Sequence, residues 1–381
     1  MSTASSDRMS PLEIRASLSL ASIFALRMLG LFLILPVFAV YATHLQGGDN
    51  HTLVGIALGT YGLTQGMLQI PYGMASDRYG RKRVIIIGLV LFAIGSFIAA
   101  MGGSIHVIIV GRAIQGAGAI SAPVMAFLAD LTREQHRTKA MALVAIWVVV
   151  SVVPQESLVN IEGADHIEKA RFGDVLRSPD LLRLNLGIFS LHAVQMAIFV
   201  VVPLAMVSAG GLPVDEHWKV YLPVVLGSFV LMVPAIFYAE KNDALKPVFL
   251  ACIGLMAAVQ LGFVFALHNF TALVILLLGF FVAFNILEAS LPSLVSRTAP
   301  GRAKGAALGV YNTTQSLGLF FGGAAGGWLM QHHGRAPVFM FGTALIALWG
   351  IAAAGMRVPQ RVRPRGADAA GGAALGDQAA R

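Results

Sequence analysis

Charged side chains are scarce in this chain of 381 residues, where Asp, Glu, Lys and Arg together make up 12%. Ordinary soluble domains carry about 25% charged residues, so a soluble fold of this composition would lack the polar surface to cover itself. Apolar residues make up 57%, and the mean hydropathy is +0.76. The composition therefore predicts an integral membrane protein.

Several kinds of chemical site are also missing from the sequence. Cysteine occurs once, at Cys252, which excludes an intramolecular disulfide framework. There is no Ser-His-Asp or Cys-His set and no metal-ligand spacing. The glycine-rich run at 322–327 is not followed by the Lys-Ser/Thr of a phosphate-binding loop. We therefore expect no enzyme activity, no metal and no cofactor.

The net charge of +8 is informative through its placement. Most basic residues fall in seven clusters separated by apolar stretches, at 8–15, 78–83, 133–139, 169–183, 241–246, 297–304 and from 357 onward. Each apolar stretch is long enough for one or two membrane crossings, so the clusters mark one side of a bilayer, which the positive-inside rule assigns to the cytoplasm. A nucleic-acid partner would instead require a basic patch on one soluble surface. We therefore expect the lipid bilayer as a partner and no nucleic acid.

Ten stretches approach the roughly 20 apolar residues that a membrane helix needs. They lie at 17–42, 52–75, 83–101, 105–129, 184–207, 218–238, 247–267, 270–296, 305–328 and 336–356. The sequence thus predicts an all-α, polytopic protein with both termini in the cytoplasm. Its expected parts are a polar N-terminus (1–14), an N-terminal bundle (15–153), a cytoplasmic linker (154–183), a six-span C-terminal bundle (184–356) and a disordered tail (357–381) rich in Gly and Ala.

One apolar stretch, Ala140–Val153, does not fit this scheme. Its 14 residues are short for a span, and basic clusters flank it on both sides. The N-terminal half is also about 37 residues shorter than the six-span half, which is close to the length of one helical hairpin. We interpret the stretch as the remnant of a fifth and a sixth span that are otherwise missing. The alternative is a re-entrant or surface helix.

The most specific local pattern lies between the second and third predicted spans, at residues 73–83 (GMASDRYGRKR). Gly73 allows close helix packing, Asp77 stands at the end of a span, and Gly80 permits a tight turn. Basic residues then anchor the next helix at the headgroups. A plain positive-inside anchor would explain the basic residues, but not an Asp directly before Arg78 or the flanking glycines.

With this loop, the sequence resembles the major facilitator superfamily, whose signature GxxxDRxGRK(R/K) it matches at every defining position. A second stretch, 111–119 (GRAIQGAGA), resembles the family's RxxQGxGxA element, and residues 130–133 (DLTR) resemble the acidic partner of the loop. The resemblance covers about residues 12–358 and is strongest to the proton-linked efflux branch, in particular bacterial inner-membrane proteins of the YajR type. Nothing in 140–153 resembles that branch's Gly-Pro motif.

The resemblance implies a fold of two helical bundles and a gating role for the signature loop. Asp77 would face the N-terminus of the eleventh helix near Gly305, where the helix dipole favours a negative charge. Arg81 would pair with Asp130. The gating residues expected on this basis are Gly73, Asp77, Arg78, Gly80, Arg81, Lys82, Asp130 and Arg133.

Ionisable residues in the middle of a span are costly and are candidates for function. Glu288 is the only acidic residue that we place inside a span, and it is either the proton carrier or part of a structural ion pair with Arg27. His192 either titrates or is a hydrogen-bonded core residue. The candidates for proton or substrate coupling are Arg27, Arg112, Gln115, His192, Asn285 and Glu288.

These features predict a secondary active transporter in the bacterial inner membrane. We expect a monomer that exports a small molecule in exchange for protons, driven by the proton gradient through alternating access. The alternative is a truncated membrane protein that does not transport and has at most a scaffold role.

Overall fold

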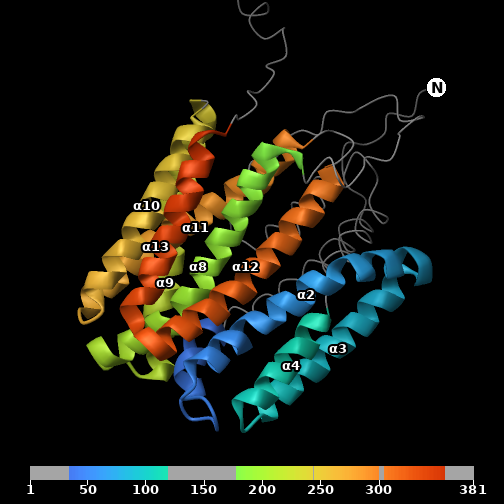
Figure 1. The fold of residues 1–381 in the computed structure, drawn as a ribbon, viewed down its shortest axis with the longest axis vertical. Helices are drawn as coiled ribbons and strands as arrows, with labels where there is room; N and C mark the ends of the chain where they lie inside the picture. Colours follow the sequence, from blue (N-terminus) through green and yellow to red (C-terminus); the bar gives the residue numbers. More distant parts are fainter. Residues whose placement is uncertain (1–33, 119–176, 243, 300–303, 357–381) are drawn as a thin grey trace, which may run out of the picture.

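The structure is a computed structural model that describes residues 34–118, 177–242, 244–299 and 304–356. These residues are almost entirely helical (Figure 1), which confirms the predicted class. A helix at 34–42 comes first. The named elements are α2 (His51–Tyr79), α3 (Arg81–Met101), α4 (Ile105–Ala117), α8 (Pro179–Gly210), the 3-10 turn η3 (Val214–Glu216), α9 (Trp218–Lys241), α10 (Leu245–Ala266), α11 (Phe270–Thr298), α12 (Lys304–His333) and α13 (Arg335–Ala354).

Short polar residues define where several helices begin. The side chain of Asn50 accepts hydrogen bonds from the backbone N–H groups of Thr52 and Leu53 at the start of α2. Ser104, Ser178 and Asn269 cap α4, α8 and α11 in the same way. Asn and Ser are favoured at this position because their oxygens satisfy the unpaired N–H groups of the first turn.

The described helices form two groups (Figure 1). Helices α8 to α13 make one bundle, and α2, α3 and α4 lie beside it. The most extensive packing between the groups joins α2 to α12, which run antiparallel. Glycines make this approach possible, since a Cβ added at Gly55 would overlap the carbonyl oxygen of Gly323. Small residues at such contacts let membrane helices pack closely.

Most of the predicted spans correspond to described helices. Six helical segments have the length and composition of a membrane span, at Arg81–Met101, Pro179–Gly210, Val214–Ala239, Leu245–Ala266, Phe270–Val295 and Arg335–Ala354. Helices α2 and α12 are long but less apolar, which suits their packing against each other. Helix α8 starts at Pro179, five residues before the predicted span, so it includes the end of the segment predicted as a linker.

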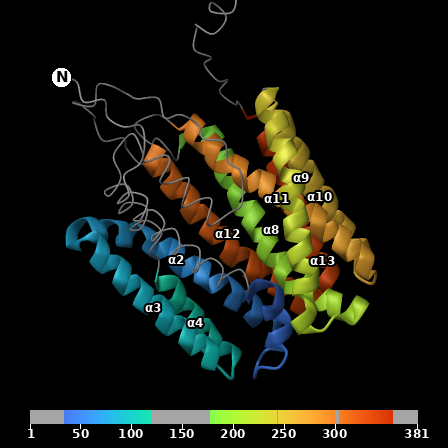
Figure 2. The ribbon, with the colours of Figure 1, turned by 180° about the vertical axis from the view of Figure 1, so that it is seen from behind.

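The helix ends gather at two ends of the molecule (Figure 2). One end, which we call the basic end, holds the α2–α3 turn, the start of α8 and the α9–α10 turn, with Arg78–Arg83, Arg183, Lys241 and Lys246. The other, the histidine end, holds the segment 43–50, the α3–α4 turn and the end of α12. There the backbone N–H of His51 donates to Oε1 of Gln331 (2.7 Å), and that of Gln46 donates to the carbonyl of Gly103 (3.2 Å).

Candidate functional site

Three polar side chains meet where α8, α11 and α12 pack together: His192, Glu288 and Gln315. The amide nitrogen of Gln315 donates to Nε2 of His192 (2.7 Å) and to Oε1 of Glu288 (3.3 Å). Nδ1 of His192 lies 3.1 Å from the carbonyl oxygen of Ile188, one helical turn earlier. These contacts fit the tautomer in which Nδ1 carries the proton and Nε2 accepts. We call the three residues the carboxylate–histidine cluster.

Glu288 is more accessible than His192 in the cluster. The Glu288 side chain is 35% exposed, whereas that of His192 is 6% exposed. Oε2 of Glu288 is buried, has no hydrogen-bond partner among the described residues and lies 3.7 Å from Nε2 of His192. The hydroxyl of Tyr311, one turn before Gln315 on α12, is also buried without a partner in this part of the chain. A proton that reaches Glu288 therefore has a second acceptor, His192, close by.

The structure separates Asn285 from this cluster, although it lies only one turn before Glu288. Its amide donates to the hydroxyl oxygen of Ser228 (2.8 Å) and so ties α11 to α9. Gln315 and Tyr311 are members or neighbours of the cluster that the sequence analysis missed. The available signal was the polar run at 311–316 (YNTTQS) in the middle of an otherwise apolar span.

Arg112 and Gln115 form a second buried polar group, in the N-terminal half. Nη1 of Arg112 donates to Oε1 of Gln115 (2.8 Å), and two longer bonds of 3.4 Å reach the carbonyls of Ala57 and Leu58 on α2. The guanidinium also lies over the Tyr61 ring, 5.1 Å from its centroid. Arg112 is 3% exposed, and no carboxylate in the described part of the chain pairs with it. Its charge is therefore held by dipoles and an aromatic face, which links α4 to α2.

The signature loop forms the turn between α2 and α3. Gly80 has φ of +96°, in the region that favours glycine, and α3 starts directly after it. Nη1 of Arg81 donates to the hydroxyl of Ser76 (2.8 Å), which fastens the start of α3 to the last turns of α2. The Arg78 guanidinium lies 5.6 Å from the Tyr79 ring centroid, and Lys82 is exposed. Asp77 lies in this last part of α2 and Gly73 one turn before it; the gating role of the loop stays a prediction.

Several predicted residues lie outside the described residues. These are Arg27, Asp130, Arg133 and the stretch 140–153. The pairing of Arg81 with Asp130 and that of Glu288 with Arg27 therefore stay predictions.

The chain is similar in sequence and in fold to known transport proteins. The family model described as Major Facilitator Superfamily matches residues 20–154, 143–322 and 184–378. The chain is 43% identical to the inner membrane transport protein YajR of Escherichia coli K12, with 93% of this chain and 86% of that protein aligned. It is 25% identical to multidrug resistance protein 2 of Bacillus subtilis, over 85% of this chain and 90% of that protein. The crystal structure of the human organic anion transporter MFSD10 matches with a TM-score of 0.63 and 17% identity, covering 90% of this chain and all of the other.

The alignment with the Escherichia coli protein is longer than this chain. It runs over 392 positions but includes 93% of the 381 residues here, about 354, so about 38 positions have no residue in this chain. An uncharacterized transporter of Buchnera aphidicola is 36% identical over 350 positions, which include 82% of this chain and 89% of that protein. The same subtraction gives a similar number of positions without a residue in this chain. The size of the difference agrees with the interpretation of a missing helical hairpin.

Proposed function

Because the chain belongs to the Major Facilitator Superfamily, we propose that it is a secondary active transporter that exports a small molecule in exchange for protons. Relatives named for multidrug and quinolone resistance support export of drug-like compounds. We place the protein in the bacterial inner membrane with both termini in the cytoplasm, as a monomer driven by the proton gradient without a cofactor. In this proposal the protein is a transporter and not an enzyme.

The observation that carries the proposal is the carboxylate–histidine cluster. Ionisable groups within a membrane protein are costly and are typical of proton relays. Glu288 is partly accessible, and its second oxygen faces His192. A proton on Glu288 would remove the negative charge that the Gln315 amide stabilises at 3.3 Å. Since the cluster joins three helices, loading and unloading of the proton would bias their packing, as alternating access requires.

The test is proton movement in liposomes that hold a pH-sensitive dye and the purified full chain. A proton gradient is imposed, and a fluoroquinolone is added as the probe. We expect the probe to accelerate proton flux with the wild-type chain. With Glu288→Gln we expect a loss of roughly a hundredfold or more, the low end of the usual effect of removing a proton-transfer group. The matched control is Glu216→Gln, because Glu216 pairs with Lys219 at the histidine end (2.7 Å), far from the cluster in the sequence. Equal flux from wild type and Glu288→Gln would contradict the assignment of the proton carrier.

A second candidate function, a membrane protein that does not transport, is favoured by the roughly 38 alignment positions that this chain lacks. The same liposomes distinguish it. If the Staphylococcus aureus quinolone resistance protein NorA moves protons with the probe and this chain does not, a panel of further cationic and anionic dyes is tested. Absence of flux with the whole panel favours the second candidate.

A further inference from the structure

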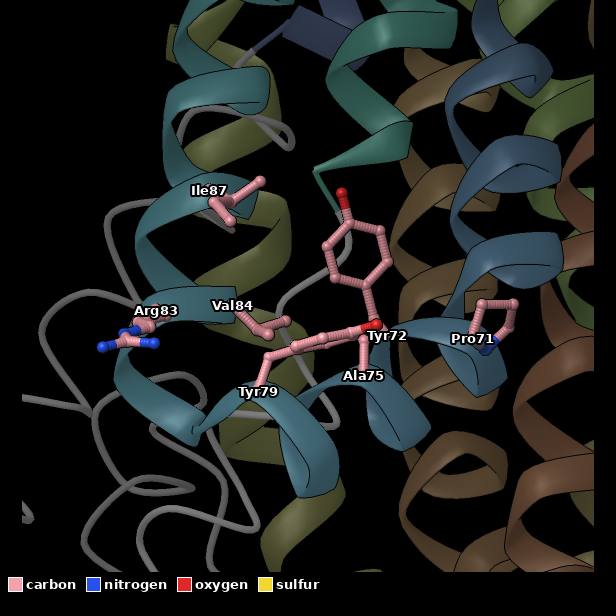
Figure 3. A pocket seen from close by; sticks show the side chains of 7 residues that line it. All are labelled: Pro71, Tyr72, Ala75, Tyr79, Arg83, Val84 and Ile87. Atoms are coloured by element: carbon pink, nitrogen blue, oxygen red, sulfur yellow. The ribbon is translucent and has the colours of Figure 1, made fainter.

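A cavity lies at the basic end of the hairpin formed by α2 and α3. It has a volume of about 470 Å³ and is lined by Pro71, Tyr72, Ala75, Tyr79, Arg83, Val84 and Ile87 (Figure 3). Among the described residues, α2 and α3 each pack more extensively on α4 than on each other. In Figure 3 the rings of Tyr72 and Tyr79 project between the two helices, and Arg83 stands at the outer edge.

The rim of this cavity is strongly basic. Residues 71–87 contain Arg78, Arg81, Lys82 and Arg83 against a single acid, Asp77. Arg78, Lys82 and Arg83 are exposed, and within the described ranges none of the three pairs with a carboxylate. Helix α3 starts at this rim without a side-chain cap, so the positive end of its dipole adds to the charge. An anion is therefore favoured here.

The walls of the cavity are apolar and continue along α3. Val84 is buried in the wall and Ile87 is 56% exposed. Further exposed apolar residues follow on the same helix: Val90 (52%), Ile94 (47%), Phe97 (67%) and Met101 (71%). Tyr72 and Tyr79 are of the type that is enriched where hydrocarbon meets headgroups. The cavity thus joins a cationic rim to an apolar surface that extends over the length of a span.

We propose that the α2–α3 cavity binds one anionic phospholipid, with its phosphate against Arg83 and Lys82 and an acyl chain along α3. A ligand for this surface must carry both a negative headgroup and a long apolar part, which a free phosphate lacks. Basic pockets between helices on the cytoplasmic side are typical of anionic lipid headgroups. The cavity lies on α2 and α3, apart from the carboxylate–histidine cluster on α8, α11 and α12, so its lining shares no residue with the proposed proton carrier.

Native mass spectrometry of the full chain in detergent, titrated with phosphatidylglycerol, tests the proposal. We expect phosphatidylglycerol to be retained in preference to phosphatidylcholine with the same acyl chains. Arg83→Gln should lower the affinity for phosphatidylglycerol roughly fivefold, the effect of one basic residue near an anionic surface. The matched control is Lys241→Gln, an exposed cation at the same end of the molecule but on α9; it should change the affinity by less than about twofold.

Two further measurements separate the lipid from other occupants. Phe97→Asn should weaken binding of a long-chain phosphatidylglycerol but not of a short-chain one, because only the long chain reaches beyond the cavity to the exposed Phe97 on α3. Inorganic phosphate should fail to displace the lipid at equal concentration. Displacement by phosphate, or equal affinity in wild type and Arg83→Gln, would overturn the proposal. If Arg83→Gln is not monodisperse, Lys82→Gln replaces it, with the same expected direction, because Lys82 is the second exposed cation proposed to face the phosphate.

Discussion

Arg112 is a buried cation that depends on neutral partners. Its guanidinium is held by Gln115, two carbonyl oxygens of α2 and the Tyr61 ring. Gln115→Leu removes the closest acceptor, and an unsatisfied buried charged group costs about 1–3 kcal/mol or more. We expect a clear fall in the thermal unfolding midpoint in detergent for this variant.

The isosteric change Gln115→Glu is the matched control for that substitution. It keeps the acceptor for Arg112 and makes it a carboxylate, while the bond that the Gln115 amide donates to the Ser96 hydroxyl (2.9 Å) is lost. We expect a midpoint close to that of wild type, because the ion pair offsets the cost of burying a second charge. If Gln115→Leu unfolds at the wild-type temperature, the contact with Gln115 does not stabilise the cation.

For single residues, the sequence revealed which ionisable side chains lie in apolar helices but not which partners they contact. Glu288, His192 and Arg112 stand out because each interrupts an apolar stretch, and their placement inside helices is as predicted. Gln315 was missed because its role arises only when α12 packs against α8 and α11. Asn285 was grouped with Glu288 by spacing, yet the two side chains face different helices.

The close packing of α2 on α12 rests on glycines toward the histidine end. A Cβ at Gly55 would overlap the Gly323 carbonyl, so Gly55→Ala should push the two helices apart there. The reporter is Thr52→Cys in a Cys252→Ala background, because the Thr52 hydroxyl is buried and has no hydrogen-bond partner. We expect Gly55→Ala to increase labelling of this cysteine by an impermeant maleimide several-fold.

Gly309 provides the control on the same helix pair. A Cβ there would meet nothing within 4 Å in the described part of the chain, so Gly309→Ala should leave the labelling rate unchanged. Equal labelling of the Gly55→Ala and Gly309→Ala variants would show that close glycine contact does not hold α2 against α12.

The same contact should respond to pH through His51 at the end of α2. Burial and the positive charge of Arg335 lower the pKa of His51 from 6.5, and Asp49 opposes this shift. The packed form therefore prefers neutral His51, and its stabilisation is present above pH 6.5 and is lost as the pH falls through the lowered pKa. Because maleimide reacts with the thiolate, whose fraction falls on acidification, the labelling rate of Thr52→Cys is divided at each pH by the rate for the denatured chain. This ratio should rise on acidification. His51→Asn should remove most of this pH dependence; an unchanged pH response in that variant would exclude His51 as its source.

The pattern of basic residues and the packing of the helices each give the direction in which the helices run, and the two are independent. The contacts of Gln46 with Gly103 and of His51 with Gln331 put the start of α4 and the end of α12 at the histidine end. Successive helices from α8 to α12 alternate in direction, so an end of α12 at the histidine end puts the start of α8 at the basic end. Helix α4 starts at the histidine end and also runs toward the basic end. We therefore predict that the chain between α4 and α8, which lies outside the described residues, crosses the membrane an even number of times.

A side-specific reporter at Gly163 tests this parity, because Gly163 lies in the predicted cytoplasmic linker between α4 and α8. We expect the fused reporter to be active only in its cytoplasmic form, with Gly103 as the control on the opposite side. A hairpin lost as a unit removes two crossings and leaves every later helix in its family orientation, so α2 and α12 still meet. A periplasmic Gly163 would mean that 140–153 crosses once. The C-terminal bundle would then be inverted, α2 could not pack antiparallel to α12, and transport by this chain would lose its structural basis.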